Sequence, residues 1–128
     1  MNHALRNAGF EWHDLPVGRL SLCSTGIEIE LLPFDEAQET FVGYLFQLMD
    51  AESITLNVSG VLTAGDLEGL EVASLEFEPN ADEQISGKLG FIPGSPSVGY
   101  WELGFTKARW RLSKHNSSFN PDALTRAG

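Results

Sequence analysis

The chain has 128 residues, the size of a single domain, and 42% of them are hydrophobic, as in an ordinary globular protein. Its formal net charge is −10, so its field repels phosphate backbones and we expect no nucleic-acid partner. Cys23 is the only cysteine, which excludes an intrachain disulfide. The sequence has neither a membrane-length apolar run nor the apolar core of a secretion signal, so we expect a cytoplasmic protein without a membrane partner.

Alternation of apolar and polar residues with period two predicts short strands along most of the chain. In chain order they cover 20–22, 27–31, 40–48, 54–58, 70–78, 85–91 and 100–112. We expect one β domain over 11–113, a weakly ordered lead-in over 1–10 and a flexible tail over 114–128. Short connections favour antiparallel pairing. The predicted fold is mainly β: an antiparallel β-sandwich or a partly open β-barrel of seven to eight strands, with at most one short helix.

The segment from Phe34 to Asp50 is ambiguous. Asp35 is able to cap a helix, with Gln38 at the third helical position. Against a helix, Gly43 stands in a run of strand-forming residues, and glycine inside a helix costs about 1 kcal/mol relative to alanine. We therefore predict a loop or short helical turn over 35–39, before the strand at 40–48.

The stretch 100–112 is the centre of the predicted fold. Its apolar residues alternate up to Phe105 and resume at Ala108, so the alternation changes phase. One extra residue in a strand produces such a change, which predicts a β-bulge near Thr106–Lys107. A similar change of phase falls within 70–78.

The charges are unevenly distributed along the chain. Between Leu20 and Gly87 there are fourteen Asp or Glu residues and no Lys or Arg, whereas four of the eight basic residues fall within 107–114. One interpretation is an ordinary solvated acidic surface, in which the basic strand forms ion pairs with an acidic neighbour. The other is an acidic face that attracts a basic protein partner.

Trp12, His13 and Asp14 are the first candidate binding residues. A histidine next to an acid can act as a base, a metal ligand or a pH switch. Adjacent residues on an extended chain point to opposite faces, however, so the two need not touch. In the simpler interpretation Trp12 packs in the core, while His13 and Asp14 bond the local backbone or each other.

Four glutamates form two short rows of carboxylates on predicted strands. They are Glu28 and Glu30 on one strand and Glu76 and Glu78 on another. Residues two apart on a strand lie about 6.6 Å apart on the same face, so each row could meet a cation. A solvated outer face is the ordinary role of such residues.

Motifs for catalysis or for a resident group are absent from the sequence. There is no nucleophile elbow, no phosphate-binding loop and no Cys or His pattern at zinc-ligand spacing. We therefore expect neither an enzyme nor a metal or cofactor site.

Five short motifs follow one another over roughly residues 11–92. They are Trp12-His13-Asp14-Leu15, Ile27–Leu31, Leu45-Phe46, Ile54–Leu56 and Leu70–Val72. Their order resembles that of small bacterial β-domain families of unknown function, some of which are classed as immunity proteins that neutralise toxins of neighbouring cells. The resemblance implies a binding protein and carries over no catalytic residue.

These observations favour a non-enzymatic protein-binding domain with an acidic face and a basic partner. Two alternatives remain open. One is a small-ligand binder or enzyme with a site near His13 and Asp14. The other is a structural homo-oligomer, for example a homodimer that pairs through an exposed strand edge.

Overall fold

The structure, a computed structural model, describes residues 10–58, 69–81, 84–93 and 100–114. The predicted lead-in and tail lie outside these ranges, apart from Phe10 and Lys114. The strands are β1 (Leu15–Cys23), β2 (Gly26–Leu31), β3 (Phe34–Asp35), β4 (Thr40–Phe41), β5 (Tyr44–Met49), β6 (Ser53–Val58), β7 (Glu71–Ala81), β8 (Gln84–Ile92) and β9 (Trp101–Lys114). The described ranges contain no helix, and therefore none that could cross a membrane. The predicted mainly β fold is confirmed.

Seven strands form one antiparallel sheet in the order β5-β2-β1-β7-β8-β9-β6. Because β5 also pairs with β9, the strands β1, β2, β5, β9, β8 and β7 follow one another around a ring. The ladder between β1 and β7 is short: it pairs Leu15 with Val72 and Pro16 with Glu71, and one further backbone hydrogen bond of 2.9 Å runs from Val17 to Leu70. The architecture is therefore a barrel that is partly open between β1 and β7, with β6 as an edge strand on β9.

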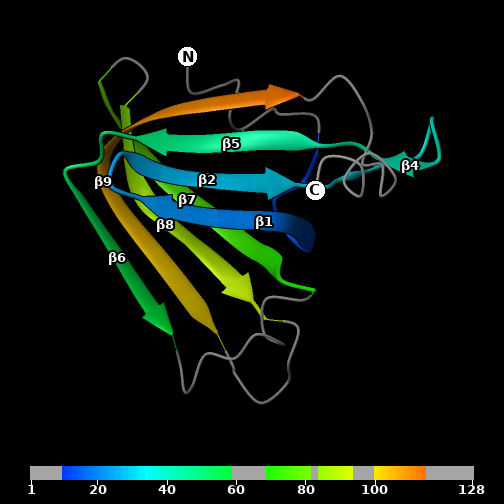
Figure 1. The fold of residues 1–128 in the computed structure, drawn as a ribbon, viewed down its shortest axis with the longest axis horizontal. Helices are drawn as coiled ribbons and strands as arrows, with labels where there is room; N and C mark the ends of the chain where they lie inside the picture. The colour runs from blue at the N-terminus through cyan, green and yellow to red at the C-terminus, as the bar shows by residue number, and fades with distance from the viewer. Residues whose placement is uncertain (1–9, 59–68, 82–83, 94–99, 115–128) are drawn as a thin grey trace.

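Strand β9 belongs to two layers of the barrel (Figure 1). Its C-terminal part pairs with β5, which continues to β2 and β1, whereas its N-terminal part pairs with β8, which continues to β7. In Figure 1 the second group of strands crosses behind the first. A long bent strand thus joins the layers, as the change of phase in 100–112 predicts.

The bend in β9 is the predicted β-bulge. Two residues of β9, Thr106 and Lys107, lie opposite the single residue Ser86 of β8. Lys107 has a φ of 50°. The backbone N–H of Lys107 donates to the Ser86 hydroxyl oxygen at 2.9 Å, so the extra residue keeps a partner. The second predicted change of phase is also confirmed, because the β7–β8 register shifts between Val72 and Ser74.

The core fills the inside of the ring with alternate residues of its strands. The buried members are Leu15, Ile27, Ile29, Leu31, Phe46, Leu48, Leu70, Val72, Ile85, Leu89, Phe91, Trp101, Leu103, Phe105 and Ala108. Close strand contact requires glycine at Gly26, which has a φ of 152° and whose Cβ would lie 2.1 Å from the carbonyl oxygen of Leu48. Burial of these side chains supplies the main stabilising term of the fold.

The segment after β2 differs in part from the prediction. A hairpin with two-residue strands pairs Phe34 with Phe41 and Asp35 with Thr40. The turn between β3 and β4 occupies the place of the predicted loop or short helical turn. The Asp35 Oδ1 accepts the backbone N–H groups of the residues two and three positions later, at 2.9 and 3.3 Å. The same two bonds would cap a helix, but here they close a hairpin turn. The predicted strand 40–48 is divided into β4 and β5.

Candidate functional site

The β3–β4 hairpin carries two exposed aromatic side chains. Phe34 is 53% exposed and Phe41 is 46% exposed. Their rings meet edge to face, with centroids 5.2 Å apart. Single exposed apolar residues are common, whereas adjacent ones form a patch of the kind that marks a contact surface.

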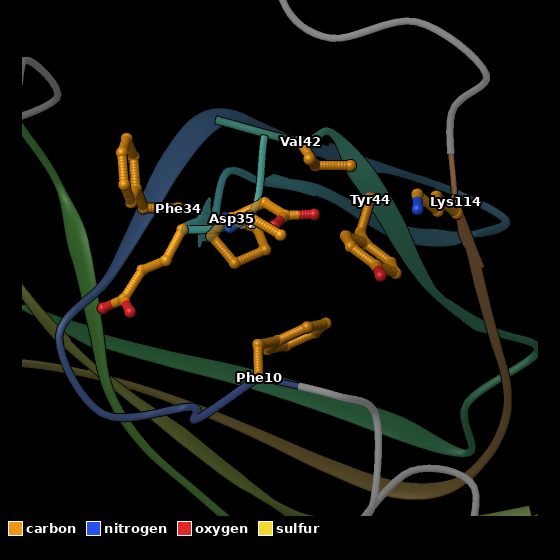
Figure 2. Close-up of a pocket in the computed structure, with 9 residues that line it drawn as sticks. Phe10, Phe34, Asp35, Val42, Tyr44 and Lys114 are labelled. Carbon is orange, nitrogen blue, oxygen red and sulfur yellow. Dashed lines mark hydrogen bonds between the residues drawn. The ribbon is translucent and has the colours of Figure 1, made fainter. Parts of the chain in front are cut away.

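A cavity of about 310 Å³ lies beside this hairpin (Figure 2). Its aromatic lining comes from Phe10, Phe34 and Tyr44, and the rings of Phe10 and Tyr44 lie 4.9 Å apart. In the view of Figure 2, Asp35 lies between Phe34 and Tyr44, and Phe10 lies on the other side of the opening. An adjoining cavity of about 460 Å³ shares Phe10 and Phe34 and adds Phe41. We call the two together the hairpin cavity.

Charged groups of one sign predominate in the lining of the hairpin cavity. It contains the carboxylates of Glu11, Asp14, Asp35 and Glu36 and the ammonium group of Lys114. Four negative charges and one positive charge give a formal sum of −3. Apolar walls lower the local dielectric constant and strengthen the attraction between these groups and a cation. Aromatic faces attract cations as well.

The hairpin cavity is assembled from three separated parts of the chain. Phe10 and Glu11 precede β1, the hairpin lies between β2 and β5, and Lys114 ends β9. The β5–β9 register places Lys114 directly opposite Tyr44. Two backbone hydrogen bonds of 2.9 Å hold the base of the hairpin, from Leu32 to Pro16 and from Val42 to Pro33.

Trp12 lies behind the hairpin cavity and is half-buried against the core. Its ring centroid is 5.4 Å from that of Phe10 and 5.1 Å from that of Phe46. Because Phe10 in turn contacts Tyr44, a row of ring contacts connects the cavity wall to the core. Trp12 therefore supports the wall.

His13 and Asp14 lie next to one another. The Nε2 of His13 is 3.2 Å from the Oδ2 of Asp14, and its Nδ1 is 3.0 Å from the carbonyl oxygen of Ala73. Asp14 has a φ of 58°, so the chain turns and brings together two side chains that would diverge on an extended strand. The Ala73 carbonyl and then the Asp14 carboxylate raise the pKa of His13, because the carbonyl accepts a hydrogen bond from the ring and the negative carboxylate attracts the protonated form.

The two glutamate rows lie elsewhere on the surface. Glu28 and Glu30 alternate with the buried residues of β2, and Glu76 and Glu78 are exposed on β7. Figure 1 shows these strands in different layers, so the outward faces of the two rows are not continuous. The carboxylate of Glu28 accepts a hydrogen bond of 2.8 Å from Gln47.

Three basic residues of β8 and β9 are paired with carboxylates. The pairs are Lys88 with Glu76 and Glu102, Lys107 with Glu52, and Arg109 with Asp50. Among the described residues, Glu11 and Glu36 form no such pair. Acidic charge at the hairpin cavity is therefore less neutralised by the protein than the charge beside β8 and β9.

The hairpin cavity combines aromatic rings with acidic side chains. The described residues that line it are aromatic, aliphatic and acidic, together with Lys114, and include no Ser, Thr, Cys or His. Across the described ranges, no three or more His, Cys, Asp or Glu residues cluster in a way that could hold a metal ion.

Comparison of the chain with family models, curated proteins and solved structures finds no match. The resemblance to small bacterial β-domain families therefore remains a hypothesis.

Sequence reasoning identified Asp14 but missed the aromatic lining. A signal was present, because Phe34 and Phe41 flank an acidic turn that contains Asp35 and Glu36. Phe10 carried no comparable signal, since its position in the wall depends on tertiary contacts.

Proposed function

We propose that the chain is a non-enzymatic protein-binding domain that engages a basic partner at the hairpin cavity. The observation that carries the proposal is the combination of exposed aromatic rings with a lining of formal charge −3. Aromatic side chains are enriched at protein interfaces because they supply large contact areas. Complementary charge accelerates encounter with a basic partner and disfavours acidic ones.

The charge of the whole chain supports the same proposal. A net charge of −10 attracts a basic protein from a distance and steers it toward the acidic surface. Such attraction is screened within about 8 Å at physiological ionic strength, so binding should weaken as salt is added.

An immunity-type role is the specific form that the motif resemblance suggests. In that case the partner is a basic, toxin-like protein encoded next to this chain. A neighbouring reading frame that encodes a basic, toxin-like protein would favour the immunity-type role. Without such a reading frame, the partner would have to be identified by capture.

Capture with matched variants tests the proposal. Glu11→Gln combined with Glu36→Gln removes two carboxylates from the hairpin cavity, and Glu76→Gln combined with Glu78→Gln removes two from β7 as a control. At about 0.2–1 kcal/mol for each exposed charge, the first variant should bind the captured basic protein roughly 2- to 30-fold more weakly. The control should bind it as the wild type does.

Two results would contradict the proposal. One is the absence of any basic protein that binds at low salt and is released at high salt. The other is equal loss of affinity in both double variants, which would assign the attraction to overall charge rather than to the hairpin cavity.

A second candidate function is homodimer formation through β6. This strand pairs only with β9 among the described strands, and its six residues include no charged residue and no proline. Ile54 and Leu56 are 39% and 38% exposed. Native proteins usually protect strand edges with charges, prolines or bulges, so an unprotected edge is suited to pairing.

Sedimentation at several concentrations tests the homodimer. If two chains pair through β6, the wild type should associate as concentration rises, and Ile54→Lys should remain monomeric because it places a charge beside the pairing edge. A wild type that stays monomeric throughout would refute this candidate.

A further inference from the structure

Resting on the proposed function, we propose that the hairpin cavity receives one arginine side chain of the basic partner. The guanidinium group lies against the aromatic lining and pairs with carboxylates at the opening. The geometry points to this ligand through three features: the chemistry of the walls, the balance of charge and the position of one carboxylate.

The walls favour a guanidinium over the ammonium of lysine. Phe10, Phe34 and Tyr44 present aromatic rings to the cavity, and Val42 adds an aliphatic surface. A guanidinium is planar and weakly hydrated, so it stacks on aromatic rings with little loss of solvation. An ammonium group is strongly hydrated and loses more on entering such a space.

The balance of charge favours a cationic ligand. Lys114 offsets one of the four carboxylates, and His13, when protonated, offsets Asp14 through their contact of 3.2 Å. Two of the four negative charges are then left over. A single guanidinium has five donors in a fixed fork and can bond two carboxylates at once.

Asp35 is held in position for such a bond. Its Oδ1 accepts the N–H groups of Ala37 and Gln38, at 2.9 and 3.3 Å, which fixes the side chain. The other oxygen, Oδ2, has no hydrogen-bond partner among the described residues. Asp35 lines the same cavity as Phe34 and Tyr44, so a guanidinium bound in the cavity is within reach of the Asp35 carboxylate.

Three capped tripeptides that differ only in the central residue test the inference on the full chain. The central residue is arginine, lysine or citrulline, which has the shape of arginine without the charge. Chemical shifts of the Val42 methyl groups and the Ala37 amide, followed by NMR at low salt, report on the cavity. We expect the arginine peptide to bind about tenfold or more tightly than the citrulline peptide and several-fold more tightly than the lysine peptide.

Substitution of an aromatic wall residue separates stacking from charge. Phe34→Leu keeps an apolar side chain on the hairpin but removes the ring, so affinity for the arginine peptide should fall roughly 2- to 5-fold. Ile92→Ala, an exposed apolar truncation on β8, is the control and should leave the affinity unchanged.

The outcomes distinguish this inference from the proposed function. Equal binding of the arginine and citrulline peptides, or of the arginine and lysine peptides, would overturn the arginine site. The proposed function would still stand if capture of a basic protein depended on Glu11 and Glu36. If that dependence were absent as well, both proposals would fail.

Discussion

Aromatic residues occupy two contrasting regions of this protein. In the β8–β9 region, Trp101 is 1% exposed and belongs to the hydrophobic core. In the β3–β4 hairpin, Phe34 and Phe41 are about half exposed and pack mainly on each other. Buried rings stabilise the fold, whereas exposed rings beside an acidic cavity are available to a partner. The two regions should therefore respond oppositely to substitution.

Trp101→Ala should produce the largest loss of stability. Removal of a buried indole costs about 3–5 kcal/mol, a large part of the stability of a typical domain. Phe41→Ala should cost only about 1 kcal/mol, because much of that ring is already in contact with water. Urea unfolding of both variants measures the difference, and similar losses would contradict the division into a core region and a binding region.

Trp101→Phe sharpens the same comparison. The indole Nε1 is buried and has no hydrogen-bond partner among the described residues, so phenylalanine sacrifices volume but no hydrogen bond. We expect this variant to be clearly more stable than Trp101→Ala. Equal destabilisation by Trp101→Phe and Trp101→Ala would indicate that Nε1 makes a hydrogen bond in solution.

Lys107 at the bulge should show an intermediate effect. Its φ of 50° is strained for a β-branched residue, so Lys107→Ile should destabilise the fold by about 1–3 kcal/mol. Lys107→Gly accepts this backbone conformation and loses only an exposed ion pair with Glu52, so its stability should stay within about 1 kcal/mol of the wild type. The free energy of unfolding of the two variants tests whether the bend requires a positive φ at position 107. A larger loss of stability for Lys107→Gly than for Lys107→Ile would contradict that requirement.

His13 should show the smallest effect, through pH. Its pKa in the folded protein is raised by the Ala73 carbonyl and by Asp14 above the ordinary value of about 6.5. Protonated His13 therefore stabilises the fold below about pH 6.5, and this contribution is lost as pH rises through the folded pKa. NMR titration of the ring, assigned with His13→Gln, should give a midpoint above 6.5. A midpoint below that value would mean that the contacts to Ala73 and Asp14 do not hold in solution.

Local pattern was sufficient to predict strands and the main bend. The phase change between Phe105 and Ala108 is a property of neighbouring residues, so it identified the bulge at Lys107 without tertiary information. Asp35 was harder, because bonds from a carboxylate to later backbone N–H groups occur in helix caps and in turns alike. Only the pairing of Phe34 with Phe41 decides between the two.

The candidate site was mostly beyond prediction from sequence. Asp14 was one of the candidate binding residues, but the cavity that it lines depends on contacts between Phe10, the hairpin and the ends of β5 and β9. The closure of the barrel by β5 and β9 determines those contacts, and strand order is not encoded in any local pattern. The two glutamate rows on β2 and β7 could be recognised from the alternation in the sequence, but they lie in different layers and do not line the hairpin cavity.

Joint measurement of stability and affinity on Phe34→Leu combined with Phe41→Leu tests the role of the hairpin most directly. If these rings serve a partner, the free energy of unfolding should change by about 1 kcal/mol or less, while affinity for the arginine tripeptide falls several-fold. A loss of several kcal/mol in stability with unchanged affinity would show that the rings belong to the core, and the hairpin cavity would not be a binding site.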